Sequence, residues 1–246
     1  MNQGKRIAVV TGAANGIGRD FCQTLAQSGI DVAGIDIADQ SAAMANAEKE
    51  NQAYLPLKAD VSNLAEMQQS MEQVAQKLGK IDIVVANAGI YPSGPFDEVT
   101  MEDWRQVMRV NLDGVFCTLQ AALPYLKQNA WGRIVVVSSA AIWHGVPLQT
   151  PYVASKAALI GLVRSLAGEV AEHGITVNAI SPGLTETDNL MNSWPGTLFD
   201  WVVEAQSIKR RMQPQDLAST LLYLIDEQSD FVTGQTINVD GGFAKH

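Results

Sequence analysis

Tyr152 and Lys156 stand four positions apart in the stretch TPYVASKAAL, residues 150–159. Thr150 and Pro151 are typical of a helix start, because a hydroxyl can cap free N–H groups and proline is well tolerated at the first helical position. The residues that follow, to about position 172, repeat apolar side chains at three- and four-residue intervals, which predicts a helix. Residues i and i+4 share a helix face, so the phenol and the ammonium are expected to be neighbours. The spacing alone is equally typical of a half-buried tyrosine beside a solvated lysine.

The composition limits the class of protein. The chain has 246 residues, 47% of them hydrophobic and 17% charged, and its formal net charge is −9. This length allows one substantial core, and an acidic chain without a basic run disfavours nucleic acid and anionic membranes as partners. Cys22 and Cys117 lie far from each other and from His144, His173 and His246, so neither a disulfide framework nor a metal site is expected. No apolar stretch reaches membrane-span length, and we expect a soluble cytoplasmic protein.

A glycine-rich turn follows the first predicted strand in TGAANGIGRD, residues 11–20. Gly12, Gly16 and Gly18 permit a tight turn and the close approach of a pyrophosphate, and the next helix offers free N–H groups at its N-terminus. Asp36 ends the second predicted strand, where a carboxylate hydrogen-bonds ribose hydroxyls and repels a 2′-phosphate. No arginine or lysine follows it in IDIADQ. Each feature alone is common in other settings, but together they predict a dinucleotide, NAD(H) rather than NADP(H).

Short β-branched runs alternate with amphipathic stretches along the chain, the order typical of a doubly wound parallel sheet. Several runs are apolar without alternation, as in strands covered on both faces. We predict a single Rossmann-like α/β domain over residues 1–246, with about seven strands flanked by helices. Residues 184–214 contain two tryptophans, interrupt the last α/β unit and are expected to form a substrate lid. The predicted strands are 6–11, 31–36, 53–60, 81–88, 133–139, 175–181 and 236–240.

Several motifs together resemble the classical short-chain dehydrogenase/reductase family. They are the Gly12-x-x-x-Gly16-x-Gly18 turn, ANAG at 86–89, SPG at 181–183 and the terminal TGQTINVDGG. The match spans essentially the whole chain in order and spacing, although the family more often has an asparagine where this chain has Ala86. The resemblance implies a Rossmann-like fold and a nicotinamide cofactor. It also implies a catalytic set that consists of Asn111, Ser139, Tyr152 and Lys156.

The same resemblance indicates which residues contact the cofactor. ADV at 59–61 matches the family's adenine-contacting stretch, residues 87–89 match the cofactor floor, and the PGxxxT motif at 182–187 matches the segment beside the nicotinamide amide. The implied cofactor residues are Gly12, Asn15, Gly16, Ile17, Gly18, Asp36, Ile37, Asp60, Val61, Asn87, Ala88, Gly89, Tyr152, Lys156, Pro182, Gly183 and Thr187.

Carbonyl reduction by hydride explains why such residues belong together. Reduction leaves negative charge on oxygen, so a proton donor must lie within hydrogen-bond reach. A free phenol has a pKa of about 10, and we expect the Lys156 ammonium and the helix dipole to lower that of Tyr152 by roughly two to three units, about 3–4 kcal/mol. Ser139 is expected to donate to the same oxygen. The resemblance further implies that Lys156 bonds the nicotinamide ribose and that Asn111 holds a water as a proton relay.

Substrate contacts in the family come from the segment after the serine, the segment after the floor motif and the insertion. The implied substrate residues are Ser139, Ala141, Trp143, His144, Tyr152, Leu184 and Trp194. The same three segments also contain Ile90, Tyr91, Pro92, Ile142, Met191, Phe199 and Trp201. Each aromatic side chain alone is typical of ordinary core. As a group they favour a flat or hydrophobic ketone or secondary alcohol.

Two other functions remain open. A 3-oxoacyl-thioester reductase acting on acyl carrier protein or coenzyme A is the first, although Ala130 and His173 stand where carrier-protein reductases tend to have basic residues. The second is a non-catalytic NAD-binding sensor, which this chain disfavours by keeping all four catalytic residues. The resemblance also implies a homotetramer that packs through long helices near 103–129 and 152–172. Ala157, Leu162 and Ala167 fit such packing and fit core burial equally well.

Overall fold

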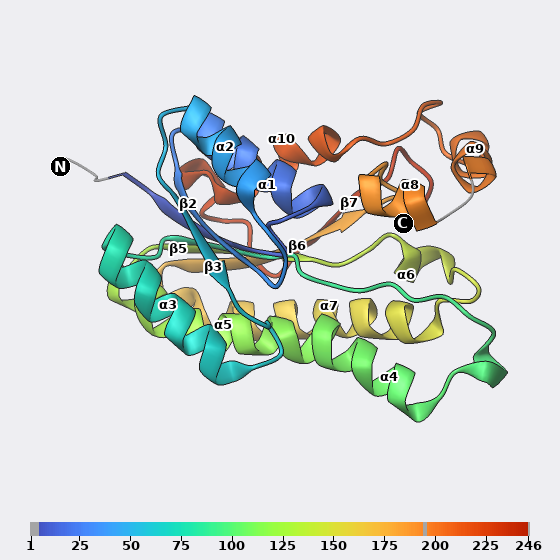
Figure 1. Ribbon diagram of the computed structural model, residues 1–246, viewed down its shortest axis with the longest axis horizontal. Helices are drawn as coiled ribbons and strands as arrows, with labels where there is room; N and C mark the ends of the chain where they lie inside the picture. Colours follow the sequence, from blue (N-terminus) through green and yellow to red (C-terminus); the bar gives the residue numbers. More distant parts are fainter. Residues whose placement is uncertain (1–4, 194–195, 246) are drawn as a thin grey trace.

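The computed structural model describes residues 5–193 and 196–245, and its centre is one all-parallel sheet of seven strands (Figure 1). The strand order β3-β2-β1-β4-β5-β6-β7 confirms the predicted doubly wound Rossmann-like fold. Every predicted strand is present, with ends that differ by up to two residues. The strands are β1 (Ile7–Thr11), β2 (Asp31–Asp36), β3 (Tyr54–Lys58), β4 (Ile83–Ala86), β5 (Gly132–Val137), β6 (Ile175–Pro182) and β7 (Thr236–Val239).

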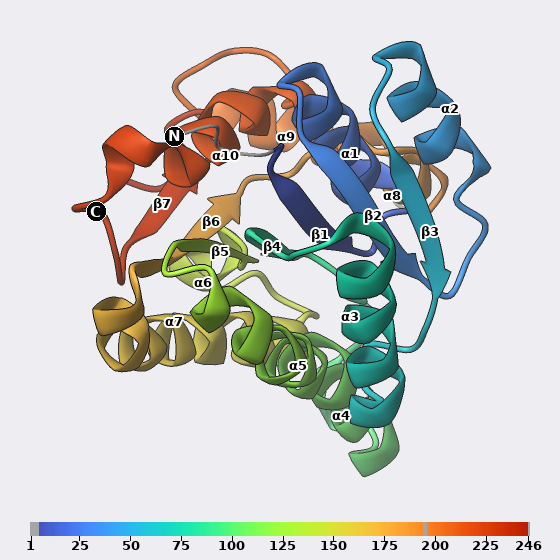
Figure 2. The same ribbon diagram turned by 90° about the vertical axis from the view of Figure 1, so that its left-hand side faces the viewer.

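Helices cover both faces of the sheet (Figures 1 and 2). One face carries α1 (Gly16–Gln27), α2 (Ser41–Lys49) and α10 (Ala218–Ile225). The other carries α3 (Leu64–Leu78), α4 (Met101–Met108), α5 (Gly114–Gln128) and α7 (Thr150–Val170). Three shorter helices, α6 (Ala141–His144), α8 (Asp188–Ser193) and α9 (Gly196–Ala205), gather at the end of the molecule where the strands finish. Single 3-10 turns occupy Phe96–Glu98, Ala171–His173, Pro214–Leu217 and Glu227–Ser229.

Successive residues of each strand enter different cores. In β1, Ala8 and Val10 pack with α1 and α10, whereas Ile7 and Val9 pack with α3, α5 and α7. All four are buried, because parallel strands are covered on both sides. Full burial of a valine or isoleucine side chain contributes about 1.5–3 kcal/mol. The two cores therefore hold the strand ends, and the loops that follow them, in fixed positions.

The strand order reverses between β1 and β4, since β2 and β3 lie on one side of β1 and β4 to β7 on the other. Loops that leave neighbouring strands at such a point diverge to opposite faces, which opens a crevice at the carboxyl ends of the strands. No helix within the described residues is long and apolar enough to cross a membrane.

Two helix boundaries differ from the predictions. Gln149, and not Thr150, is the N-cap of α7, and no side chain caps this end, so Thr150 is the first helical residue and Pro151 the second. The predicted helix over 103–129 is α4 and α5 joined by a π-helical turn, Arg109–Asp113. A π turn admits one extra residue into the helix and is frequent at functional sites. Here it contains the buried Asn111.

Candidate active site

A cleft of about 940 Å³ opens at the carboxyl ends of β1, β4, β5 and β6. The loops after these strands form one side, and α8, α9 and the C-terminal residues form the other. Of the predicted cofactor residues, all but Gly18 line the cleft. The structure thus gathers positions 12 to 187 into one cavity, as a dinucleotide site requires.

The glycine-rich turn has the shape of a phosphate cradle. Gly12 has a positive φ of 67°, and a Cβ there would lie 2.8 Å from Asn87 Nδ2 and 2.9 Å from Ala88 Cα, so no larger residue fits. Asn15, the N-cap of α1, makes no side-chain capping bond, which leaves the first N–H groups of the helix available to an anion. Gly18 has another function. A Cβ there would lie 2.0 Å from the Gly12 carbonyl oxygen, so this glycine lets α1 pack against the turn.

Asp36 is held by two backbone amides. Its Oδ2 accepts a hydrogen bond of 2.9 Å from Ala14 N–H in the glycine-rich turn, and its Oδ1 accepts one of 2.9 Å from Ala38 N–H. The carboxylate is therefore fixed at the rim of the cleft with lone pairs still free for hydroxyl donors. Ile37 lies beside it and is 67% exposed, which suits stacking on a planar ring.

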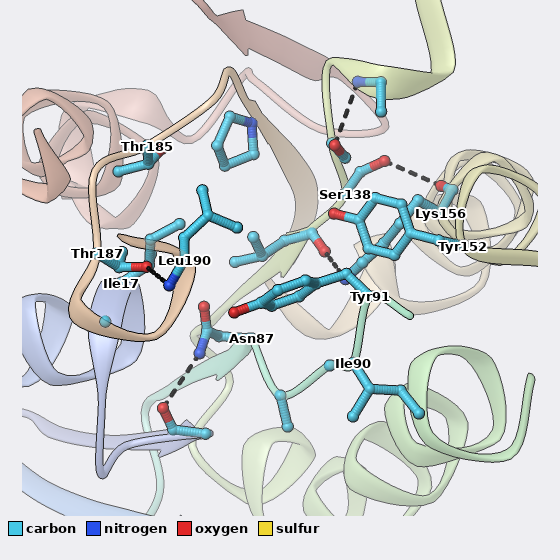
Figure 3. A pocket seen from close by; sticks show the side chains of 18 of the residues that line it. Ile17, Asn87, Ile90, Tyr91, Ser138, Tyr152, Lys156, Thr185, Thr187 and Leu190 are labelled. Carbon is cyan, nitrogen blue, oxygen red and sulfur yellow. Dashed lines mark hydrogen bonds between the residues drawn. The ribbon is translucent and has the colours of Figure 1, made fainter. Parts of the chain in front are cut away.

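The floor of the cleft is joined to β1 by Thr11. Asn87 N–H and Ala88 N–H both donate to Thr11 Oγ1, at 3.0 and 3.2 Å. The Asn87 side chain, which is labelled in Figure 3, donates to the carbonyl oxygens of Thr11 at 3.0 Å and Gly12 at 3.3 Å. These bonds hold residues 87–89 against the glycine-rich turn. Sequence reasoning missed Thr11, whose hydroxyl just before a glycine-rich turn is the only signal it leaves.

Tyr152 and Lys156 lie on one side of α7, as their spacing predicts, and both line the cleft. Tyr152 is in the first turn of α7, and its phenol interacts with the Ser139 hydroxyl, which follows β5 and also lines the cleft. The Lys156 ammonium donates to the Val137 carbonyl oxygen at 2.8 Å and lies 6.0 Å from the centre of the Tyr152 ring. Tyr91 meets the same ring edge-on at 6.5 Å (Figure 3). Three segments thus converge on the phenol.

The predicted decrease in the pKa of Tyr152 is wrong, because the side chains around the phenol together raise its pKa. Burial raises the pKa of this phenol, the hydrogen bond with Ser139 opposes that increase, and Tyr91 adds to it. Burial also lowers the pKa of Lys156 to about 8. Desolvation disfavours the charged form of each group, and it is the largest cause of both shifts. The Tyr152 phenol is therefore protonated at neutral pH.

Asn111 lies behind the cleft and clamps the floor loop. Its Oδ1 accepts from Ile90 N–H at 2.8 Å, and its Nδ2 donates to the Ile90 carbonyl oxygen at 2.9 Å and to Ser155 Oγ at 3.1 Å. The side chain is fully buried. These bonds occupy the amide with protein partners, and the water relay inferred for this residue stays a prediction.

Comparison with known proteins agrees with this geometry. A family model described as enoyl-(acyl carrier protein) reductase matches residues 12–244. The 3-oxoacyl-[acyl-carrier-protein] reductase FabG of Thermotoga maritima is 36% identical over 242 residues, which cover 96% of this chain and 97% of that protein. A (2S)-[(R)-hydroxy(phenyl)methyl]succinyl-CoA dehydrogenase subunit, BbsD of Thauera aromatica, is 36% identical over 239 residues, 96% of each chain. The crystal structure of carveol dehydrogenase from Mycobacterium avium in complex with NAD superposes with a TM-score of 0.90 at 25% identity and 97% coverage of both chains.

The chain belongs to the short-chain dehydrogenase/reductase family. It is an oxidoreductase that acts on CH–OH groups with a nicotinamide cofactor. The residues around the cleft suit that cofactor, because the backbone at Gly12 and Gly16 carries no side chain that would block a pyrophosphate, and Asp36 and Ile37 offer a carboxylate and an apolar side chain on which a nucleoside could lie. Among the described residues, no three histidine, cysteine, aspartate or glutamate side chains are grouped as a metal site.

Some of the residues named from the sequence for the substrate segments line this dehydrogenase cleft, and others do not. Ser139, Ala141, His144, Tyr152 and Leu184 line it, as do Ile90, Tyr91 and Trp201. Trp143, Ile142, Pro92, Met191 and Phe199 do not; Trp143 is 37% exposed, and Phe199 is buried beneath Arg211. Trp194 lies outside the described residues.

Sequence reasoning missed several residues of the cleft. Ser138 lines it and donates to the Lys156 carbonyl oxygen at 2.9 Å, which joins β5 to α7 (Figure 3). Asp240 and Phe243 line it from the C-terminal end of the chain. A contact between residues 144 and 243 leaves no local pattern in the sequence. The only sign of Phe243 is that VDGGF contains an aromatic residue.

Proposed function

We propose that this enzyme interconverts a secondary alcohol and a ketone with NAD(H), and that its substrate is hydrophobic or aromatic. The observation that carries the proposal is that the Tyr152 phenol and the Ser139 hydroxyl face each other in a cleft whose walls are largely apolar and aromatic. Tyr91, Leu190, Leu198 and Trp201 belong to those walls. A pocket of this kind, with a few convergent polar groups, fits an apolar carbonyl compound.

In the reducing direction, Tyr152 donates its phenolic proton to the carbonyl oxygen as negative charge develops there. Ser139 donates a second hydrogen bond to the same oxygen and so stabilises that charge. When bound, the nicotinamide supplies or accepts the hydride. Lys156, a cation below its pKa of about 8, stabilises the phenolate that remains and returns a proton to it. The proton transfers reverse when the alcohol is oxidised.

We further propose that NADH is preferred over NADPH. The Asp36 carboxylate is held in place by the two backbone amides and would face a 2′-phosphate with like charge. Lys58 pairs with Asp36 in the sheet register, but it is not among the residues that line the cleft. We expect kcat/KM with NADH to exceed that with NADPH at least about 10-fold, since a single like-charge contact is worth a few kcal/mol.

Asp36→Ala tests the cofactor proposal. The substitution removes the repulsion, so the ratio of kcat/KM between NADH and NADPH should approach one. Asp39→Ala is the matched control, because Asp39 is exposed and does not line the cleft. Equal use of both cofactors by the unaltered enzyme would contradict the preference.

The test of the reaction is a panel of matched ketones and secondary alcohols, followed through NADH absorbance. Phenyl methyl ketone and its alcohol represent the proposed class. Tyr152→Phe should lower kcat at least about 100-fold, because a positioned general acid contributes that much. The dissociation constant of NADH should change little. Activity of this variant at the unaltered level would contradict the assignment of Tyr152.

A second candidate is reduction of a 3-oxoacyl thioester. It is favoured by the similarity to the Thermotoga maritima reductase and to the Thauera aromatica dehydrogenase subunit, whose names specify an acyl carrier protein and a CoA substrate. The net charge of −9 opposes it, because an acidic surface repels an acidic carrier. Acetoacetyl-CoA tested beside phenyl methyl ketone separates the two functions. A higher kcat/KM with the thioester would favour the second.

We propose a homotetramer as the assembly. The outer face of α7 carries small residues at helical spacing, among them Ala157, Ala158, Gly161 and Gly168, all exposed. Phe116 on α5, on the same side of the sheet, is 51% exposed. A face of small and apolar residues allows two helices to approach closely, which suits contact with a second copy. Of the residues named from the sequence for this role, Ala157 is exposed, Leu162 is half-buried and Ala167 is buried.

A further inference from the structure

The residues after β7 turn back into the cleft around one buried carboxylate. Asp240 is 5% exposed. Its Oδ1 accepts from Gly242 N–H at 2.9 Å and Phe243 N–H at 3.2 Å, and its Oδ2 accepts from Ala244 N–H at 2.7 Å and Asn238 Nδ2 at 2.8 Å. Four donors on one carboxylate define the turn closely. They therefore fix where the Phe243 ring lies.

The Phe243 ring completes an aromatic corner, which consists of His144, Trp201 and Phe243. The ring centre of Phe243 lies 3.9 Å from that of His144 and 5.6 Å from that of Trp201, with interplanar angles of 75° and 70°. Edge-to-face contacts of this kind are worth about 0.5–1.5 kcal/mol each beyond burial. The three side chains come from α6, α9 and the C-terminal turn, and all line the cleft.

Backbone hydrogen bonds also join the turn to the end of α9. The N–H groups of Ser207 and Ile208 both donate to the Gly241 carbonyl oxygen at 2.9 Å. On the opposite side, a Cβ at Gly183 would lie 2.8 Å from Asp240 Cα, so the segment after β6 packs directly on the turn. The aromatic corner is thus held from two sides before any substrate binds, which lowers the entropy lost on binding.

The aromatic corner carries no cation at neutral pH. His144 Nε2 is 3.7 Å from Asp240 Oδ2, too far for a hydrogen bond, and has no hydrogen-bond partner among the described residues. Burial lowers the pKa of His144, and the Asp240 carboxylate acts in the opposite direction. A neutral imidazole beside two carbocyclic rings suits an uncharged planar group better than an anionic one.

We propose that Phe243, positioned by Asp240, determines specificity, and that the aromatic corner receives an uncharged planar ring joined to the substrate carbonyl carbon. This inference rests on the proposed alcohol and ketone chemistry. It names the part of the substrate that the enzyme selects, and it gives the C-terminal turn a direct function in recognition.

Phe243→Ala, assayed with phenyl methyl ketone and with 2-butanone, tests the proposal. We expect kcat/KM for the phenyl ketone to fall at least about 10-fold, since two ring contacts and part of the buried area are lost. The value for 2-butanone should change less than about 3-fold, because a small alkyl group gains little from either ring contact. Phe231→Ala is the matched control, because Phe231 is fully exposed and does not line the cleft.

Two further variants separate recognition from folding. Phe243→Leu keeps most of the volume and should lose selectivity for the phenyl ketone without loss of stability. Asp240→Asn places an N–H₂ group where the turn requires an acceptor, so it should shift selectivity in the same direction through displacement of Phe243. An equal fall for both ketones in Phe243→Leu, or no change for either, would overturn the proposal.

Binding measurements make the result independent of turnover. Titration of phenyl methyl ketone into the enzyme with NADH, followed by ligand-observed NMR, should show binding that Phe243→Ala weakens at least about 10-fold. NADH binding should be the same in both proteins. If the unaltered enzyme bound the phenyl ketone but reduced no ketone, the proposed reaction would be wrong, and the proposal that the aromatic corner binds a planar ring would remain. If Phe243→Ala bound the phenyl ketone as tightly as the unaltered enzyme, the proposed function of the aromatic corner would be wrong, and the proposed reaction would be unaffected.

Discussion

The Lys156 side chain is a buried cation, and its burial lowers the stability of the folded protein. The residue is 4% exposed, and its ammonium donates a hydrogen bond to the Val137 carbonyl oxygen at 2.8 Å. Burial lowers its pKa to about 8 from an ordinary 10.5. That difference corresponds to about 3 kcal/mol of unfavourable free energy in the folded protein. Active sites commonly carry such unfavourable groups, because the chemistry requires them.

Lys156→Met should therefore abolish turnover and stabilise the protein at pH 7 by about 2 kcal/mol, after allowance for the lost hydrogen bond. Because the folded pKa lies below the unfolded one, the cost of the lysine is fully present below pH 8. It disappears as the pH rises from about 8 to 10.5, where the group becomes neutral in both states. Denaturant unfolding at pH 7 and at pH 10 measures the gain and its loss. Lys127→Met, at an exposed position, is the control.

The spacing of Tyr152 and Lys156 was sufficient to predict that they share a helix face. The spacing was not sufficient to predict whether the pKa of Tyr152 is raised or lowered. That sign depends on burial of the phenol and on the neighbouring Tyr91, which lies 61 positions earlier in the chain. Local pattern specifies neighbours along a helix, whereas desolvation depends on segments that only the fold brings together. A less stable Lys156→Met variant would contradict the dominant effect of burial.

At the level of elements, the strands could be predicted and the π turn could not. Apolar β-branched runs indicate buried strands directly. The π turn at Arg109–Asp113 leaves no periodic signal, because a single turn of five residues is too short to show a period of its own. The C-terminal turn was equally invisible, since Asp240 acts through backbone N–H groups that every sequence provides.

Asn111→Ala tests the function of the π turn. It leaves Ile90 N–H and the Ile90 carbonyl oxygen without their Asn111 partner in a half-buried loop, which should destabilise the protein by about 2–4 kcal/mol. The same loop carries Gly89 and Tyr91 into the cleft. We therefore expect kcat/KM for the ketone to fall at least about 10-fold and NADH affinity to weaken as well. Thermal unfolding and titration of NADH measure the two effects.

Ser155→Ala is the informative comparison for this variant. Ser155 Oγ accepts only one of the three Asn111 bonds, at 3.1 Å, and the Ile90 clamp does not depend on it. Its removal should cost about 1 kcal/mol and leave the activity nearly unchanged. If the two variants behaved alike, Asn111 would act through Ser155 and not through the floor loop.

At the level of the molecule, the exposed small residues of α7 suggest that assembly uses close helix packing. Gly161 lies in the middle of this helix, and nothing lies within 4 Å of the position that a Cβ would occupy. A glycine in a helix interior costs about 1 kcal/mol relative to alanine. Within one subunit nothing packs on the open position beside this glycine, and the proposed contact with a second copy would account for it.

Gly161→Arg should break the proposed tetramer into smaller species while the subunit stays folded, because arginine has the higher helix propensity and the space around the position is open. Light scattering after size exclusion measures the mass against a chain mass of 26.5 kDa. Gly161→Ala serves as the control, since a methyl group permits close packing, and it should keep the mass of the unaltered protein. Because the large arginine side chain extends well beyond the helix surface, no close contact through this face survives it. An unchanged mass for Gly161→Arg would therefore place the subunit interface on another face of the molecule.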